Sequence, residues 1–152
     1  RVESGKLLIM MPILELESGA LYPVNKAHIM GKLFHDISSA LTFLHEANFV
    51  FVDLKPSNIC IHKGDFILVD IGSIVQAESS AVRTTESFLP TLFPLNIASF
   101  QMDWWMLAVT MLWFVKEVQQ PHRYSKTEII RKLNQCELID KNTVNELLSH
   151  LH

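Results

Sequence analysis

Residues 53–58 read Asp-Leu-Lys-Pro-Ser-Asn, and residues 70–72 read Asp-Ile-Gly. Within eighteen residues these stretches place a carboxylate, an amine, a carboxamide and a second carboxylate, which are Asp53, Lys55, Asn58 and Asp70. Phosphoryl transfer uses such a set, because one carboxylate orients the attacking hydroxyl, a cation lies near the transferred phosphate, and an amide and a carboxylate hold Mg²⁺. The spacing therefore indicates a phosphoryl-transfer centre.

The residues between the two motifs predict a β-hairpin. Apolar runs at 59–62 and 66–69 flank Lys63-Gly64-Asp65, and a glycine-containing turn between two such runs is typical of a hairpin. The hairpin would place Asn58 before its first strand and Asp70 after its second. Both side chains are therefore expected on loops that adjoin short apolar strands.

Helical patterns surround this hairpin. An apolar stripe at three- and four-residue spacings predicts an amphipathic helix over residues 26–47. A second helix is predicted to begin at Asp103 and to run from Trp104 to about Val118. Its apolar run is shorter than the roughly 20 residues that a membrane span needs, so we expect a buried core helix. Two weaker amphipathic helices are expected at 125–133 and 140–151, the first with a capping-box pattern.

These motifs resemble those of the protein kinase family. The family pattern His-Arg-Asp-Leu-Lys-Pro-x-Asn appears here at residues 51–58, and Asp-Phe-Gly appears at 70–72. The start of the apolar helix, Asp103-Trp104-Trp105, is similar to a third family segment. The resemblance implies a mainly α (α+β) fold, the C-terminal lobe of a kinase, in which a short β-hairpin carries the catalytic and metal loops. Residues 1–152 would form one partial domain, from the last small-lobe strand and the hinge to the late large-lobe helices.

The resemblance also implies a role for each motif residue. Asp53 would be the catalytic base, Lys55 would neutralise charge on the transferred phosphate, and Asn58 with Asp70 would hold Mg²⁺. Lysine two residues after the aspartate is the pattern of serine/threonine kinases, so the expected partners are ATP and a protein substrate with Ser or Thr. The expected adenine contacts are Met11, Ile13, Leu14 and Cys60. Asp103 is expected to hold the catalytic loop in place.

Several neighbours of the motif depart from the family pattern. Phe51 replaces His and Ile71 replaces Phe, two positions that stack in an apolar column, and we expect the pair to keep the column because its volume is conserved. Val52 replaces the arginine that grips a phosphorylated activation segment through bidentate contacts. Activity is therefore expected to be independent of phosphorylation in the irregular segment 73–95, where Leu92 also replaces the family's Glu.

Two functional interpretations follow. The first is the large lobe of a divergent serine/threonine protein kinase, which is not competent without a small lobe N-terminal to Lys6, since the 152 residues contain no glycine-rich phosphate fingerprint. The alternative is a pseudokinase or regulatory scaffold that acts through protein–protein interaction. The retained Asp53, Lys55, Asn58 and Asp70 favour the enzyme, whereas the altered neighbours favour the scaffold.

The composition bears on the possible binding partners and on the cellular location. A net charge of −3 and an isoelectric point near 6.2 give no electrostatic reason to expect binding to nucleic acid or to a membrane surface. Two cysteines, Cys60 and Cys136, are too few for a disulfide framework, so we expect an intracellular, cytoplasmic location.

Overall fold

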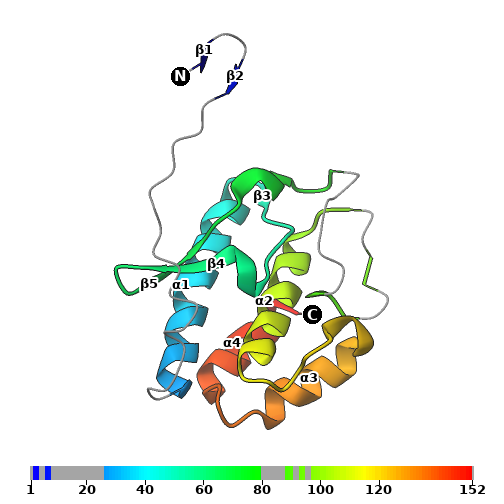
Figure 1. The fold of residues 1–152 in the computed structure, drawn as a ribbon. Coiled ribbons are helices and arrows are strands. Elements are labelled where there is room, and N and C mark those ends of the chain that lie inside the picture. Colours follow the sequence, from blue (N-terminus) through cyan, green and yellow to red (C-terminus); the bar gives the residue numbers. More distant parts are fainter. Residues whose placement is uncertain are drawn as a thin grey trace.

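The computed structural model describes residues 2–3, 6–7, 26–79, 88–90, 93–94 and 97–151, with side chains from residue 28 onward (Figure 1). Near the N-terminus, β1 (Val2–Glu3) pairs with β2 (Lys6–Leu7) as a short antiparallel ladder. Four predicted features lie outside the described residues: the hinge, the adenine contacts at Met11, Ile13 and Leu14, residues 80–87 of the irregular segment, and Leu92.

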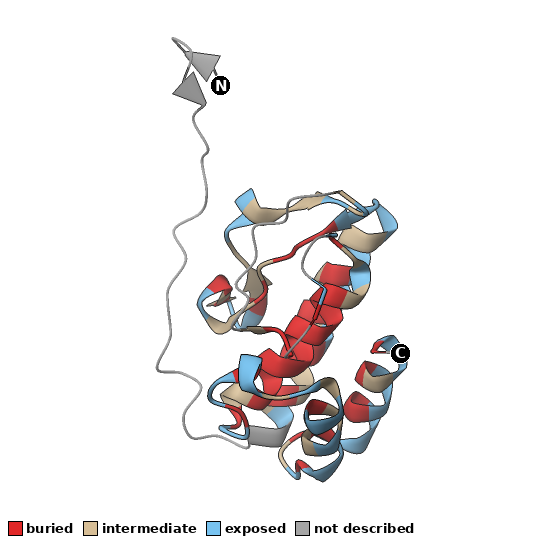
Figure 2. Ribbon diagram, turned by 90° about the vertical axis from the view of Figure 1, so that its right-hand side faces the viewer, coloured by how far each residue is buried: buried red, intermediate tan, exposed pale blue. Residues whose placement is uncertain are grey.

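The core is built on α2 (Phe100–Phe114), in which residues 102–112 are all buried. Figure 2 shows this helix in red through the body of the molecule. The predicted start at Asp103 is wrong by one turn, and the predicted end near Val118 is four residues too late. Ser99 is the N-cap of α2, because its side chain accepts the N–H of Met102 at 3.2 Å. This cap makes the helix begin earlier than the apolar pattern indicated.

The predicted long helix is confirmed as α1 (Lys26–Glu46), which packs against α2 and against the predicted hairpin. In the hairpin, β4 (Ile59–His62) pairs with β5 (Asp65–Leu68) in antiparallel register, from Ile59 opposite Leu68 to His62 opposite Asp65. Lys63 and Gly64 form the turn with φ values of 52° and 88°. Two successive positive φ angles match the twist of a tight hairpin, so the second strand begins one residue earlier than predicted.

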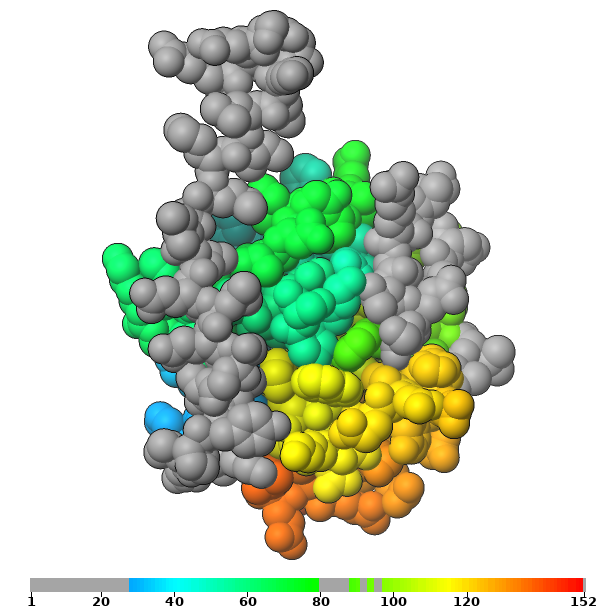
Figure 3. Space-filling model, in the orientation of Figure 1, coloured from blue at the N-terminus to red at the C-terminus, as the bar shows by residue number. Residues whose placement is uncertain are grey.

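A second, unpredicted ladder joins β3 (Phe49–Val50) to β6 (Val75–Gln76). Strands of two residues carry no period that a sequence pattern could show. The ladder ties the chain just before the 53–58 motif to the chain just after the 70–72 motif. In Figure 3, teal to green atoms of these loops reach the surface in the upper middle of the face shown, and those of the hairpin lie toward its left edge.

The two C-terminal helices are confirmed as α3 (Lys126–Gln135) and α4 (Lys141–His150), which pack against α2 and against each other. Ser125 and Glu128 form the predicted capping box at the start of α3. Asp140 caps α4 by accepting the N–H groups of the first turn. No helix in the part of the chain that the structure describes is long and apolar enough to cross a membrane.

Candidate active site

The 53–58 motif is anchored from below by Asp103, whose side chain is fully buried at the start of α2. Its two oxygens accept the N–H groups of Phe51 at 2.8 Å and Val52 at 2.9 Å. Two successive backbone amides on one carboxylate form a nest, an arrangement that stabilises negative charge. The expected contact between Asp103 and the loop that carries the 53–58 motif is thus confirmed.

His45 adds a third donor to the same carboxylate. Its Nε2 lies 2.9 Å from Asp103 Oδ2, and because an ionised carboxylate only accepts, the ring nitrogen is the donor. The His45 ring stacks on Phe100 at a centroid distance of 4.5 Å and meets Trp104 edge-on at 5.9 Å. No role in the site was predicted for His45 from the sequence. The available signal was a histidine in the last turn of the helix that precedes the motif.

Three of the four predicted catalytic and metal residues lie together. Lys55 Nζ donates to Asp53 Oδ2 at 2.8 Å, and Asn58 Nδ2 donates to both the backbone oxygen of Asp53 at 2.8 Å and Oδ2 at 3.1 Å. Asn58 is buried, and Pro56–Asn58 forms a 3₁₀ turn that brings the amide back over Asp53. The Asp53 carboxylate is therefore held by the amide nitrogen of Asn58 and by the ammonium group of Lys55.

Asp70, the fourth predicted residue, is held close to Asn58 along the backbone. The N–H of Val69 donates to the backbone oxygen of Asn58 at 2.9 Å, so Asp70 leaves the hairpin directly beside the other loop. Asp70 itself is exposed and adopts a left-handed conformation with φ 62° and ψ 58°. Aspartate tolerates that region better than most residues.

The donor set of these two loops fits a magnesium ion. Both hydrogen bonds from the Asn58 side chain to Asp53 use Nδ2 and not Oδ1, so the amide oxygen is oriented away from Asp53. Together with the Asp70 carboxylate it offers the hard oxygen ligands that Mg²⁺ prefers, with water completing the shell. In the described residues no group of three or more His, Cys, Asp or Glu side chains forms a separate metal cluster.

The expected buried pair of Phe51 and Ile71 is wrong for Ile71. Phe51 is fully buried, but Ile71 is 58% exposed and opens a 3₁₀ turn, Ile71–Ser73, at the surface. Conserved volume preserves an apolar column only where both side chains have packed neighbours. Among the residues that the structure describes, none encloses Ile71.

Val52 is buried in the core and has a positive φ of 59°. The left-handed region is unusual for a β-branched residue and costs conformational energy. That energy is offset by the hydrogen bond from the Val52 N–H to Asp103. Because Val52 carries no charge, the structure offers no guanidinium at this position, and independence from phosphorylation stays a prediction.

Cys60, the remaining predicted adenine contact, lies on β4 as a free thiol that is 6% exposed. Its position one residue into the hairpin, next to the loop of Asn58, is compatible with that role. The contact between Cys60 and adenine stays a prediction.

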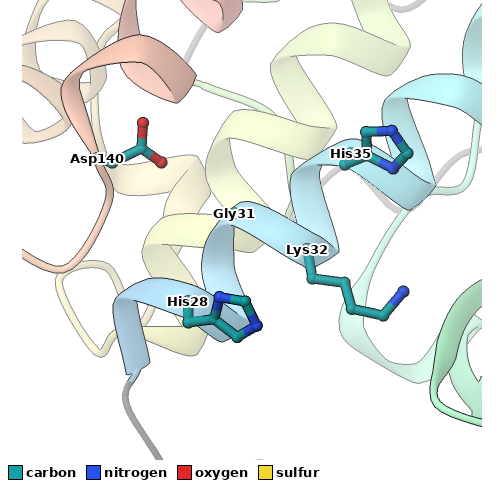
Figure 4. Close-up of a pocket in the computed structure, with 5 residues that line it drawn as sticks. All are labelled: His28, Gly31, Lys32, His35 and Asp140. Atoms are coloured by element: carbon teal, nitrogen blue, oxygen red, sulfur yellow. The ribbon is translucent and has the colours of Figure 1, made fainter.

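A hollow elsewhere on the molecule is separate from this cluster. Figure 4 shows it between the first half of α1 and the N-cap of α4, lined by His28, Gly31, Lys32, His35 and Asp140. The Lys32 ammonium forms ion pairs with Asp36 at 2.7 Å and Asp65 at 2.8 Å, so its charge is already matched. None of the predicted site residues lines this hollow.

The geometry agrees with comparisons to known proteins. The family model described as "protein kinase domain" matches residues 8–151, and the chain therefore belongs to the protein kinase family. A search of curated proteins found no match.

Among solved structures, the chain is similar to one described as "ROP18 kinase domain in complex with AMP-PNP and sucrose", with a TM-score of 0.59 and 19% sequence identity. The match covers 84% of this chain and 35% of the other, so the chain spans about a third of that kinase's length. At this identity the likeness establishes the fold alone. It is the kinase-like fold expected from the sequence, and the described part of it corresponds to a partial kinase domain.

Proposed function

We propose that residues 1–152 form the large-lobe part of a kinase that transfers a phosphoryl group from ATP to Ser or Thr of a protein substrate. One observation carries the proposal: Asp53, Lys55 and Asn58 are joined by hydrogen bonds of 2.8–3.1 Å. Asp103 holds the backbone beneath them. A set of buried and half-buried polar side chains at this spacing has a clear use in phosphoryl transfer.

In the proposed reaction, Asp53 orients the substrate hydroxyl and accepts its proton as the oxygen attacks the terminal phosphorus of ATP. The bond from that phosphorus to the bridging oxygen breaks, and ADP leaves. Lys55 Nζ lies 2.8 Å from Asp53, which supports a role for its ammonium in neutralising the charge of the phosphate oxygens.

Asn58 Oδ1 and the Asp70 carboxylate would hold Mg²⁺, which supplies charge neutralisation at the phosphate oxygens when bound. The similar kinase domain was solved in complex with AMP-PNP, which supports a nucleotide as the ligand. Cys60, together with Met11, Ile13 and Leu14, would contact the adenine.

The chain by itself is proposed not to complete the reaction. In the family pattern a small lobe adds a glycine-rich loop and a lysine that bind the phosphates. The 152 residues contain five isolated glycines and no such fingerprint. We also propose a reducing, cytoplasmic location, which the two free, buried cysteines support.

The test is the thermal shift of the full chain with AMP-PNP in the presence and absence of Mg²⁺. A ligand that binds only the folded state raises the melting temperature. We expect a shift that needs both components and is lost in Asp70→Asn. The control Glu137→Gln changes an exposed carboxyl far along the sequence and should keep the shift. Serine, threonine and tyrosine peptides, offered to a longer chain that adds a small lobe, test the substrate class.

The second candidate is a regulatory scaffold without phosphotransfer. Ile71 favours it, because a 58% exposed aliphatic side chain at the metal loop leaves that loop without the packed column of the family. If the folded chain and the longer chain both fail to bind AMP-PNP with Mg²⁺, the enzyme proposal is contradicted and the scaffold remains.

A further inference from the structure

A groove of about 380 Å³ lies between the second half of α1 and the last turns of α4. Its lining includes Ser39, Phe43 and Glu46 from α1, Trp104 from α2, and Glu146 and His150 from α4. None of the candidate active-site residues lines it. Its volume is within the range of pockets that hold a small ligand or a single large side chain.

Aromatic rings contribute to the lining of this groove. The His150 ring stacks on Trp104 with a centroid distance of 3.8 Å and an angle of 8°, and Trp104 is held in turn by the edge of His45. Burial lowers the pKa of His150, and the nearby His45 lowers it further, against an opposing effect of Glu146. The lowered pKa favours the neutral form of the ring. Phe43 adds a second aromatic surface and is 72% exposed.

Carboxylates from two helices contribute to the lining of the groove, Glu46 from α1 and Glu146 from α4. Glu46 and Glu146 form no ion pair among the residues that the structure describes, and the groove lining contains no lysine or arginine. The other polar groups include the hydroxyl of Ser39, which donates to the backbone oxygen of His35 at 2.7 Å and keeps its oxygen as an acceptor. The groove thus combines acceptors, negative charge and aromatic faces.

A guanidinium group is the ligand that these three properties fit. It is planar and always charged, carries five N–H donors and no acceptor, and stacks on aromatic rings. An ammonium group shares the charge but neither the planar shape nor the stacking. An acidic or neutral side chain would leave both carboxylates without a counter-charge.

We propose that this groove is a docking site for an arginine side chain in an extended segment of a partner protein, with Glu46 and Glu146 binding the guanidinium. The apolar residues that flank the arginine would lie against Phe43. The surface is separate from the proposed catalytic cluster, so a partner could bind here whether or not the chain transfers phosphate.

The probe is a fluorescently labelled seven-residue peptide with a central arginine between leucines, titrated into the full chain by anisotropy. Matched peptides carry lysine or citrulline at the centre, since citrulline keeps the shape of arginine without its charge. We expect the arginine peptide to bind at least tenfold more tightly than the citrulline peptide and more tightly than the lysine peptide. Equal affinity of all three would overturn the proposal, and this comparison needs no variant.

Variants then locate the site. The double variant Glu46→Gln with Glu146→Gln should weaken the arginine peptide at least tenfold, and Phe43→Ser should weaken it several-fold. Glu137→Gln, an exposed carboxyl outside the groove, should change affinity less than twofold. Circular dichroism confirms folding, which we expect because all three substituted groove residues are exposed. If Glu137→Gln weakens the arginine peptide as much as the groove variants do, the peptide is held by non-specific electrostatic attraction and the proposal fails.

A second copy of the chain is the competing occupant. Sedimentation of the full chain alone distinguishes it, because a dimer that Phe43→Ser dissociates would mean that the groove is covered by another copy. That result would also overturn the docking of an arginine segment.

Discussion

Asp103 and His45 share a hydrogen bond of 2.9 Å although 58 residues separate them in the sequence. The same oxygen, Asp103 Oδ2, also accepts the N–H of Phe51. One buried atom therefore joins the end of α1, the start of α2 and the loop that carries Asp53. This contact fixes the loop at residues 51–58 against α1 and α2.

Asp103→Asn is expected to destabilise the fold because an amide has one acceptor oxygen where the carboxylate has two. Three donors would then compete for it, and leaving one buried donor unsatisfied costs about 1–3 kcal/mol. Urea unfolding should show a lower midpoint with an unchanged slope. His45→Phe keeps an aromatic ring and removes only the hydrogen bond from His45 to Asp103. It should therefore lower the stability less than Asp103→Asn does. A wild-type midpoint in Asp103→Asn would contradict the anchoring role.

Asp36 is expected to make stability depend on pH. Burial disfavours its charge, but Lys32, the N–H of Phe66 and His35 outweigh burial and lower the pKa of the carboxyl. A lowered folded-state pKa means that the unfolded state takes up protons first as pH falls, so the contribution is present above the ordinary carboxyl pKa and is lost in acid.

The variant Asp36→Asn tests this contribution. Its free energy of unfolding is compared with that of the wild type at pH 7 and at pH 3. At pH 7 we expect a loss of about 1 kcal/mol, mainly because the charge-assisted bond from the Phe66 N–H becomes a weaker bond to a neutral amide oxygen, since the partly exposed Lys32 pair adds little. The difference between wild type and variant should shrink at pH 3. A constant difference across this range would exclude the charge of Asp36 as its source.

Thr110→Val tests a buried hydroxyl in α2. Thr110 Oγ1 is buried and has no hydrogen-bond partner among the described residues, so an apolar group of the same shape should leave stability unchanged or raise it by up to about 1 kcal/mol. The control is Thr143→Val, because Thr143 Oγ1 donates to Asp140 Oδ2 at 2.6 Å. That variant should lower the melting temperature. The reverse order would show that Thr110 is hydrogen-bonded in solution.

At Val52 we expect substitution by glycine to destabilise the fold less than substitution by alanine, which reverses the usual order. Val52→Ala and Val52→Gly both remove a buried side chain, but only glycine relieves the cost of a positive φ. We expect the glycine variant to be more stable than the alanine variant by about 1 kcal/mol, after the greater freedom of unfolded glycine is counted. At Ala40, within α1, substitution by glycine should destabilise in the ordinary way. Chemical denaturation of all three variants checks this order.

Much of the fold was predictable because its signals are local. The turn at Lys63-Gly64, the capping box at Ser125 and the apolar stripe of α1 each depend on residues within one or two turns of chain. The start of α2 was missed because the capping hydrogen bond of Ser99 decides it, whereas the apolar pattern begins later. Local signals thus identified elements better than their ends.

The candidate site was predictable in its residue types but not in its packing. Asp53, Lys55 and Asn58 do lie together, as their close spacing indicated. The role of His45 depends on a contact across 58 residues, and the exposure of Ile71 depends on which segments cover it. Neither is encoded within a short window of sequence, so the pattern alone could not yield them.

The hairpin restricts the insertions that this chain can accept during evolution. Asn58 directly precedes β4 and Asp70 follows β5, with Ile59 paired to Leu68 between them. An equal number of residues added to both strands would lengthen the hairpin and leave its base intact. An insertion in a single strand would shift the pairing and displace one of the two loops relative to the other. Related chains that keep the proposed metal site should therefore vary in the combined length of the two strands by even numbers of residues.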